Sequence, residues 1–269
     1  MKTTRGLSIF AYTIGFYMNK FEINSRYGLQ KQELLDVIEN FNISGETIGN
    51  ANRNHIKIFE RNGKSINIKS FKEPIIINKI VYRFFRKSKA QRSFEFANRL
   101  LELGIGTPTP IAYFEKYDFI GLKKSYYISE QLDADLTYRE LVRDPNYPDH
   151  ENILEQFTAF SYQLHEKGIE FKDHSQGNTL IIKNGTQYKF YLVDLNRMEF
   201  HNNMPFDLRM KNLSRLTPKK EMVAQMSKTY AALSNEPYEK VFRTLWRYTQ
   251  RFQKRFHKRR NIKKKLKLK

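Results

Sequence analysis

The chain has 269 residues, no cysteine and a formal net charge of +20. Without thiols it can form neither a disulfide framework nor a thiolate metal site. Hydrophobic residues make up 40%, which excludes a disordered composition. The excess of positive charge favours an anionic partner: a phosphate-rich lipid, a nucleic acid or a nucleotide. The length suits one large domain or a two-lobed one.

The N-terminal segment has the outline of a signal peptide. Lys2 and Arg5 precede an apolar run from Leu7 to Met18. No small-residue cleavage site follows this run, and it is too short to span a bilayer. We therefore expect a strand, a short helix or a misplaced start codon here rather than an export signal, and we treat residues 1–43 as an N-terminal extension.

The first half of the chain is predicted to be a sheet with one inserted helix. Alternating apolar residues on both sides of an Asn-Gly pair are typical of a hairpin, and apolar residues at helical spacing before a glycine indicate a helix and its end. The predicted features are a strand at 55–59, the Asn62-Gly63 turn, a strand at 66–69, apolar runs at 75–77 and 80–85, a helix at 88–103, and strands at 111–114 and 125–129.

The second half is predicted to be mainly helical. A helix at 152–167 carries Ile153, Phe157, Phe160 and Leu164 on one face. Two strands at 179–182 and 189–193 follow, joined by an Asn-Gly turn, and helices run from residue 212 onward. The last sixteen residues, 254–269, contain ten basic residues and no acidic one. This basic tail is either a solvated helix end or a surface for anionic lipid headgroups.

Three polar residues in the second half have the spacing of a phosphoryl-transfer site. Asp173 and Asn178 lie in a loop after the helix that ends at Gly168, and a strand follows at once. Asp194 comes sixteen residues later, at the end of another strand. Phosphoryl transfer needs one carboxylate at the substrate hydroxyl, and an amide oxygen and a second carboxylate to hold Mg²⁺. The order and setting of these residues favour that chemistry over isolated turn or cap residues.

This segment resembles the protein-kinase-like superfamily and, within it, the bacterial lipopolysaccharide kinases that act on Kdo or heptose. The superfamily reads His-Arg-Asp, then Asn five residues later, then Asp-Phe-Gly. Here the corresponding segments read Phe171-Lys172-Asp173, Asn178 and Asp194-Leu195-Asn196. The resemblance covers roughly residues 44 to 235. It implies Asp173 as catalytic base, Asn178 and Asp194 as metal ligands, and ATP and Mg²⁺ as cofactors.

The departures from the superfamily pattern can be interpreted physically. Phe171 and Leu195 are both apolar, so a packing contact between their positions can survive. Asn196 replaces a glycine, and asparagine tolerates a positive φ better than most residues. Lys172 keeps the charge of an arginine but loses its planar fork. Together with the absence of an Ala-Pro-Glu motif, this argues against regulation by a phosphorylated activation loop.

The resemblance also requires a strand lysine at the nucleotide phosphates and a helix glutamate that holds it. Ile66-Asn67-Ile68-Lys69 resembles Val-Ala-Ile-Lys, so Lys69 is the expected lysine and Lys72 the alternative. Strand alternation puts Asn67 and Lys69 on the face opposite Ile66 and Ile68. For the acid, Glu95 is preferred to Glu102, which lies almost at the helix end.

Two further segments are assigned to the nucleotide. No Gly-rich phosphate loop is obvious, but the loop Ser44–Asn50, with Gly45 and Gly49, could cover the phosphates with backbone N–H groups. The strand at 125–129 resembles the one that leads into a kinase hinge. Backbone groups from Glu130 to Leu132 would then pair with adenine.

The resemblance implies an α+β, two-lobed protein-kinase-like fold. A small antiparallel sheet lobe with one helix would occupy residues 44–132, and a larger, mostly helical lobe residues 133–253, followed by the basic tail. The expected acceptor is Kdo-lipid A or the heptosylated core, modified by a cytoplasmic enzyme peripheral to the inner membrane. A basic segment beside the cleft suits the carboxylate of Kdo and the phosphates of lipid A; its members are Arg83, Arg86, Lys87, Lys89 and Arg92.

Three other functions are alternatives to this one. A nucleic-acid-binding protein would suit the charge and interleaved aromatics such as Phe252, but no recognised motif supports it. A pseudokinase scaffold is disfavoured because Lys69, Asp173, Asn178 and Asp194 are all present. A kinase that acts on a protein or a soluble small molecule stays open.

Overall fold

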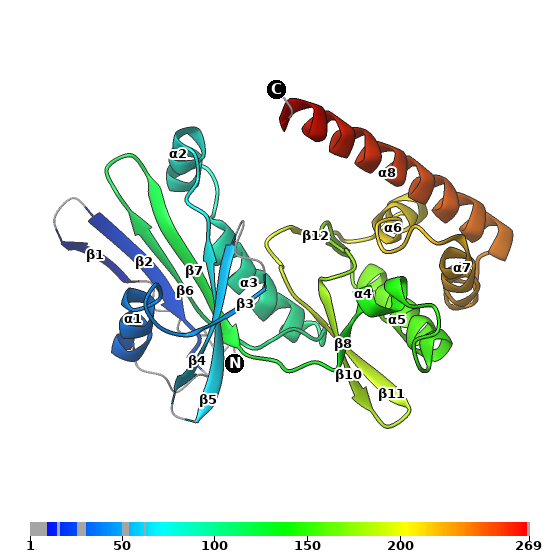
Figure 1. The fold of residues 1–269 in the computed structure, drawn as a ribbon, viewed down its shortest axis with the longest axis horizontal. Helices are drawn as coiled ribbons and strands as arrows, with labels where there is room; N and C mark the ends of the chain where they lie inside the picture. The colour runs from blue at the N-terminus through cyan, green and yellow to red at the C-terminus, as the bar shows by residue number, and fades with distance from the viewer. Residues whose placement is uncertain (1–9, 15–16, 26–30, 50–53, 62, 268–269) are drawn as a thin grey trace. The chain divides into compact units, whose positions relative to one another are not determined.

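The structure is a computed structural model that describes residues 10–14, 17–25, 31–49, 54–61 and 63–267. The chain divides into two compact units, Met1–Leu132 and Asp133–Lys269 (Figure 1). Each unit has its own core, and each is described by itself.

The first unit is built on a seven-stranded, fully antiparallel sheet in the order β1-β2-β6-β7-β5-β4-β3. The predicted hairpin and the strands that follow the predicted helix are confirmed. The segment predicted as an extension contributes two strands and a helix, because β2 pairs with β6 along its length. The strands are β1 (Phe10–Ile14), β2 (Tyr17–Ile23), β3 (Glu46–Ile48), β4 (Asn54–Arg61), β5 (Lys64–Phe71), β6 (Pro110–Tyr117) and β7 (Leu122–Glu130).

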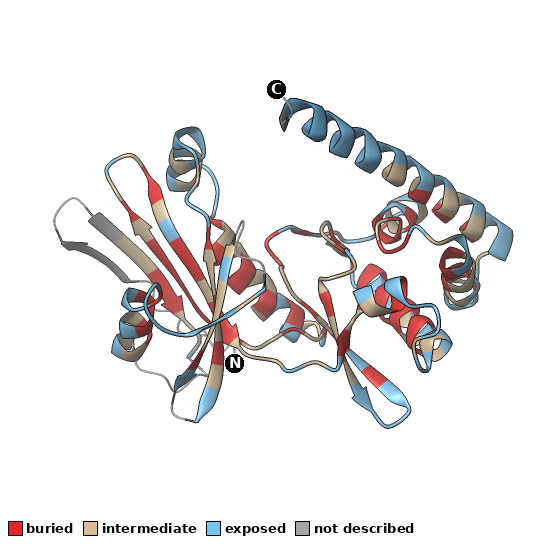
Figure 2. Cartoon of the chain, viewed as in Figure 1, coloured by how far each residue is buried: buried red, intermediate tan, exposed pale blue. Residues whose placement is uncertain are grey.

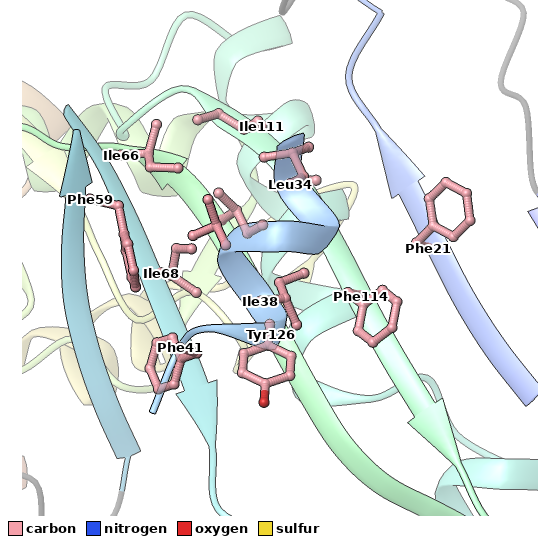
Figure 3. Packing of buried hydrophobic residues seen from close by; sticks show 13 residues of the cluster. Phe21, Leu34, Ile38, Phe41, Phe59, Ile66, Ile68, Ile111, Phe114 and Tyr126 are labelled. Carbon is pink, nitrogen blue, oxygen red and sulfur yellow. The ribbon is translucent and has the colours of Figure 1, made fainter. Parts of the chain in front are cut away.

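Two helices cover opposite faces of this sheet. Helix α1 (Lys31–Glu39) buries Leu34, Val37 and Ile38 against one face, where they meet β5 side chains such as Ile66 and Ile68 (Figure 3). Helix α3 (Lys89–Glu102) covers the other face, and its Phe94 packs in a cluster with Phe71 and Tyr113. The Ser88 hydroxyl caps α3, and Gly104 follows it at φ 70°. The predicted inserted helix is thus confirmed.

The apolar runs at 75–77 and 80–85 do not enter the sheet. They form helix α2 (Ile76–Phe84), none of whose residues is buried (Figure 2). The first unit therefore has three helices among its described residues rather than the one that the sequence predicted. A short apolar run does not distinguish a strand from a helix, which is why periodicity alone could not assign this segment.

The second unit is mainly helical, as predicted. Helix α5 (His150–Glu166) buries all four residues of its predicted apolar face. The predicted strand pair is β10 and β11, and the loop of interest lies beside the small β9–β12 pair. The other elements are β8 (Leu136–Thr137), α4 (Tyr138–Arg143), β9 (Ile169–Phe171), β10 (Thr179–Asn184), β11 (Gln187–Leu192), β12 (Met198–Phe200), α6 (Phe206–Leu213), α7 (Lys220–Ser234) and α8 (Tyr238–Lys267).

Helix α8 carries most of the basic tail. It continues as a helix to Lys267, and its residues from Lys254 to Leu266 are exposed or partly exposed. Within the described ranges, no helix combines the length and the apolar character needed to cross a bilayer.

Candidate active site

The loop that carries Asp173 and Asn178 is joined to the segment around Asp194 at both of its ends. At one end, the Lys172 N–H donates to the Arg197 carbonyl at 2.9 Å. At the other, the Val193 N–H donates to the Asn178 carbonyl at 3.0 Å. The β9–β12 pairing continues the first of these contacts, with Phe171 opposite Met198. The structure thus brings the three sequence-predicted residues of this unit into one hydrogen-bonded loop pair.

The side chain of Asn178 also fixes the loop from within. Its amide nitrogen donates to the backbone carbonyl of Asp173 at 2.8 Å. The amide group is thereby oriented, with its oxygen directed away from this contact. The Asp173 carboxylate, about a third exposed, accepts a hydrogen bond from Arg197 at 3.0 Å. The charge of Asp173 therefore has a fixed cationic neighbour that the sequence did not single out.

Asp194 has a left-handed backbone, with φ 61°. This conformation is uncommon for a residue other than glycine and is concentrated at functional sites. Asn196, expected to adopt the positive φ of the glycine it replaces, does not; this expectation is wrong. Its amide instead donates to the Asp194 carboxylate at 2.7 Å. Phe171 and Leu195 are both buried, as their predicted packing role requires.

A buried polar chain supports the loop from behind. The Asn212 amide donates to the Phe171 carbonyl at 2.9 Å, and the Asn212 oxygen lies 3.2 Å from His165 Nε2. Because that oxygen is an acceptor, His165 must carry its proton on Nε2, so Nδ1 accepts from the Tyr230 hydroxyl at 2.9 Å. Burial lowers the pKa of His165 to about 3, so the ring is neutral at physiological pH.

Sequence reasoning included His165 and the segment Arg209–Leu216 in the family resemblance but assigned them no supporting role. A third residue, Arg215, also supports the loop, because its guanidinium donates to the Lys172 carbonyl. The carbonyls just before Asp173 are thus both held by side chains from the α6 region. The available signal in the sequence was that resemblance and the polar residues interspersed with Met210 and Leu213 at 209–215, and neither identifies a partner.

In the first unit, Lys69 lies on β5 as the alternation predicted. Ile66 and Ile68 are fully buried under α1, while Lys69 shares the opposite face with Phe71, which packs under α3. The Lys69 ammonium lies 5.5 Å from the centre of the Phe71 ring. The lysine is therefore on the face of the sheet that α3 covers.

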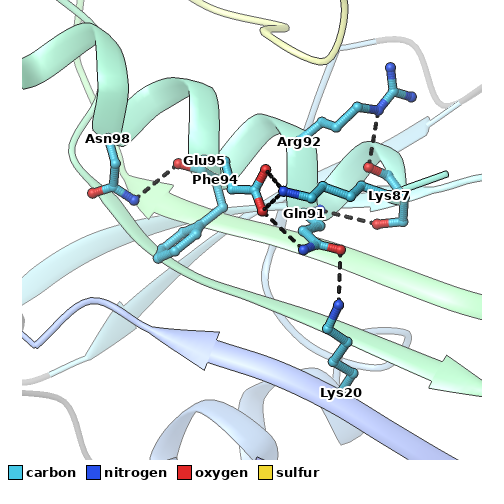
Figure 4. A network of polar contacts seen from close by, with 8 residues as sticks. Lys20, Lys87, Gln91, Arg92, Phe94, Glu95 and Asn98 are labelled. Atoms are coloured by element: carbon cyan, nitrogen blue, oxygen red, sulfur yellow. Dashed lines mark hydrogen bonds and ion pairs between the residues drawn. The ribbon is translucent and has the colours of Figure 1, made fainter. Parts of the chain in front are cut away.

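Glu95 pairs with Lys87 and Gln91 rather than with Lys69 (Figure 4). Both carboxylate oxygens accept from Lys87 at 2.8 Å, and one also accepts from the Gln91 amide at 3.0 Å. Lys87 is more than half exposed, so this ion pair contributes little to stability. Glu102, the alternative, is exposed near the end of α3.

The predicted phosphate loop is partly a strand. Glu46–Ile48 of the expected loop form β3, so only its last part leads into the β3–β4 connection. Gly45 has φ 83°, and a side chain there would collide with the buried Phe59 ring. Gly49 has φ 74° and open space around it, at the start of that connection. Residues 50–53 lie outside the described residues.

The expected hinge lies at the end of β7. The Glu130 N–H donates to Thr109, and the Gln131 N–H donates to Ser65, both at 2.9 Å. These two donors therefore serve backbone carbonyls of the same unit rather than a ligand.

The basic segment beside α3 is largely committed to internal contacts. Arg83 donates to the carbonyls of Asp118 and Phe119, and Lys87 pairs with Glu95. Arg92 donates to the Ser88 carbonyl at 3.3 Å. These contacts weaken the expectation that the segment as a whole serves the acceptor.

The donor set of the second unit fits a magnesium ion. Mg²⁺ prefers oxygen ligands, usually one or two carboxylates together with phosphates. Asp194 supplies a carboxylate, and the orientation of the Asn178 amide leaves an oxygen, not a nitrogen, for a metal. No soft or imidazole ligand is required by this arrangement.

The comparisons with known proteins define the class of protein. The fold is similar to the solved structure described as "WaaP in complex with acyl carrier protein", with a TM-score of 0.56 and 15% sequence identity, over 82% of this chain and 92% of that one. This likeness supports the two-lobed kinase-like fold. The search of curated proteins gave no match. Residues 31–236 match the model of the lipopolysaccharide kinase (Kdo/WaaP) family, and the chain belongs to that family.

Proposed function

We propose that this chain transfers the γ-phosphoryl group of ATP to a hydroxyl group of Kdo or heptose in the lipopolysaccharide inner core. Membership of the lipopolysaccharide kinase family supports a phosphotransferase. The observation that carries the proposal is the paired loop in which two backbone hydrogen bonds bracket Asp173, Asn178 and Asp194. One carboxylate is available for the acceptor hydroxyl, and a second carboxylate and an amide oxygen for the metal.

Asp173 is the proposed catalytic base. Its carboxylate orients the acceptor hydroxyl and takes its proton as the new O–P bond forms. The hydrogen bond from Arg197 holds the carboxylate in one direction, and the side chains that anchor the carbonyls of Phe171 and Lys172 hold the loop beneath it. Positioning of this kind is most of what a protein contributes to phosphoryl transfer.

Asn178 and Asp194 are the proposed metal ligands. The left-handed backbone at Asp194 costs conformational energy, and such strain is concentrated at functional sites. The Asn196 amide fixes one oxygen of the Asp194 carboxylate. Mg²⁺, when bound, would neutralise charge on the phosphate oxygens.

Lys69, Glu95 and the hinge are proposed to bind the nucleotide. Lys69 contacts the phosphates, and Glu95 holds it after exchanging its exposed partner Lys87. Because an exposed ion pair is worth at most about 1 kcal/mol, that exchange has a low cost. Gly49 begins the β3–β4 connection that is proposed to cover the phosphates. Gly45 is needed instead because a side chain there would collide with Phe59.

The acceptor is proposed to be lipid-linked, as Kdo-lipid A or the heptosylated core, at the cytoplasmic face of the inner membrane. The support is the family and the ten basic residues of the tail, nine of which lie on helix α8. Each cation near an anionic surface adds roughly 1 kcal/mol of attraction.

The test is phosphoryl transfer from labelled ATP with Mg²⁺ to Kdo-lipid A, heptosylated core, soluble sugars, a protein or RNA. We expect label on the inner-core sugar. Asp173→Ala should lower turnover by roughly 100-fold or more while ATP still binds, and Asp194→Ala should also remove Mg²⁺-dependent ATP binding. The matched control is Asp144→Ala, at an exposed loop position of the same unit. Label only on protein, or near-normal turnover by Asp173→Ala, would show the assignment to be wrong.

A further inference from the structure

Helix α2 carries large apolar side chains on an exposed face. Its apolar side chains at positions 76, 77, 80 and 84 share one face by helical spacing. That face is exposed: Ile76 is 63%, Ile77 71% and Phe84 67% accessible to solvent. A globular protein normally turns such a face toward its core.

Two cations of α2 tie the helix to the rest of the unit, and the partly buried side chains of the helix are Lys79, Val81 and Tyr82. Lys79 forms ion pairs with Glu73 and Asp118, and Arg83 donates to the carbonyls of Asp118 and Phe119 at 2.9 Å. The side chain of Lys79 is only 11% exposed. These contacts tie the helix to the β6–β7 turn, while Ile76, Ile77 and Phe84 stay exposed.

Further exposed apolar side chains flank this face in the chain and on the β6–β7 turn. Ile75 precedes the helix, Phe85 follows it at 82% exposure, and Phe119 lies on the β6–β7 turn whose carbonyl Arg83 binds. We call this the α2 patch; its members are Ile75, Ile76, Ile77, Ile80, Phe84, Phe85 and Phe119. Large apolar side chains exposed together in this way are typical of an interaction site rather than of single residues scattered over a surface.

The charges around the patch indicate its occupant. Lys72 and Arg86 flank the segment 75–85 in the chain and are exposed, and the chain has a net charge of +20. Large apolar side chains on a protruding helix, bordered by cations, have the composition of helices that lie in the interface of anionic bilayers. The patch itself offers only apolar side chains, which a bilayer accommodates without specific hydrogen bonds.

We propose that the α2 patch inserts into the interface of an anionic lipid bilayer. This proposal rests on the proposed function, in which the basic tail attracts the chain to the membrane. The α2 patch would add an apolar contact from the first unit. Vesicle binding requires neither ATP nor an acceptor sugar, so its failure and the failure of the phosphotransfer proposal are observed in separate experiments.

The absence of cysteine allows a direct test with the full chain. A single cysteine introduced by Ile77→Cys is labelled with an environment-sensitive fluorophore. The matched control is Ile43→Cys, at an equally exposed apolar position of the same unit, 83% accessible but outside the patch. On adding vesicles of phosphatidylcholine and phosphatidylglycerol, we expect the fluorescence at position 77 to rise and shift to the blue, and that at position 43 to stay unchanged.

A second measurement uses sedimentation with the same vesicles. The double variant Ile77→Ser/Phe84→Ser should bind at least roughly tenfold more weakly, whereas Ile43→Ser should bind as the unmodified chain does. A tenfold loss corresponds to about 1.4 kcal/mol, less than two such side chains gain on burial. If the fluorophore at position 77 is silent while the chain still sediments with vesicles, the tail alone binds lipid and the proposal is wrong. A signal at position 77 that rises with protein concentration without vesicles would show self-association instead, and would also overturn it.

Discussion

Two buried histidines of the second unit predict a specific loss of stability in mild acid. His165 is 1% exposed and His174 is fully buried between the rings of Phe157 and Phe171. Burial lowers the pKa of His165 to about 3 and that of His174 to about 4. In the unfolded chain both return to about 6.5. As the pH falls below that value, the two histidines bind protons in the unfolded state but stay neutral in the folded state.

The size of the effect follows from proton linkage. The neutral folded forms contribute stability that is fully present above about pH 6.5 and is lost as the pH falls toward the folded pKa values. Between about pH 7.5 and about pH 5.5, each histidine should lower the free energy of unfolding by about 1.4 kcal/mol, and the two together by about 2.7 kcal/mol. Both folded pKa values lie well below this window, so the result is insensitive to their detail.

The assay is urea unfolding followed by tryptophan fluorescence at several pH values. The single tryptophan, Trp246, lies on α8 and so reports the unit that contains both histidines. The double variant His165→Gln/His174→Gln gives the background from all other groups, and each single variant should remove half of the difference. The same pH dependence in the unmodified chain and the double variant would refute the reasoning.

Three further outcomes are expected. Lys69→Ala should lower kcat/KM by roughly tenfold or more while Lys72→Ala has no effect, because only Lys69 shares the face of β5 that α3 covers; the opposite result would place the register wrongly. Truncation after Gln253 should weaken binding to anionic vesicles and remove most of its salt dependence without changing ATP affinity; unchanged vesicle binding would contradict this, and loss of RNA binding instead would favour a nucleic-acid partner. Gly168→Ala should destabilise the chain by more than about 2 kcal/mol, since its Cβ would meet the His201 carbonyl as well as a positive φ, whereas Gly185→Ala, with open space, should cost only about 1 kcal/mol in urea unfolding; equal effects would rule out the backbone collision.

The sequence by itself determined the local elements and the chemistry-bearing segment. The β4–β5 hairpin, helix α3 and helix α5 follow from period and turn residues, which act over a few neighbours in the chain. The order Asp173, Asn178, Asp194 was visible because a loop between a helix and a strand is also a local feature. Their family could therefore be predicted from residues alone.

Only the tertiary structure decided which distant groups meet. Asn212, Arg215 and Arg197 support the loop from positions 24 to 43 residues away, a separation at which sequence spacing carries no information about contact. Folding also decided that Lys87 is the partner of Glu95 and that the apolar residues of α2 are exposed. Ion pairing and burial are properties of the assembled surface, and they are fixed by the neighbours that folding supplies.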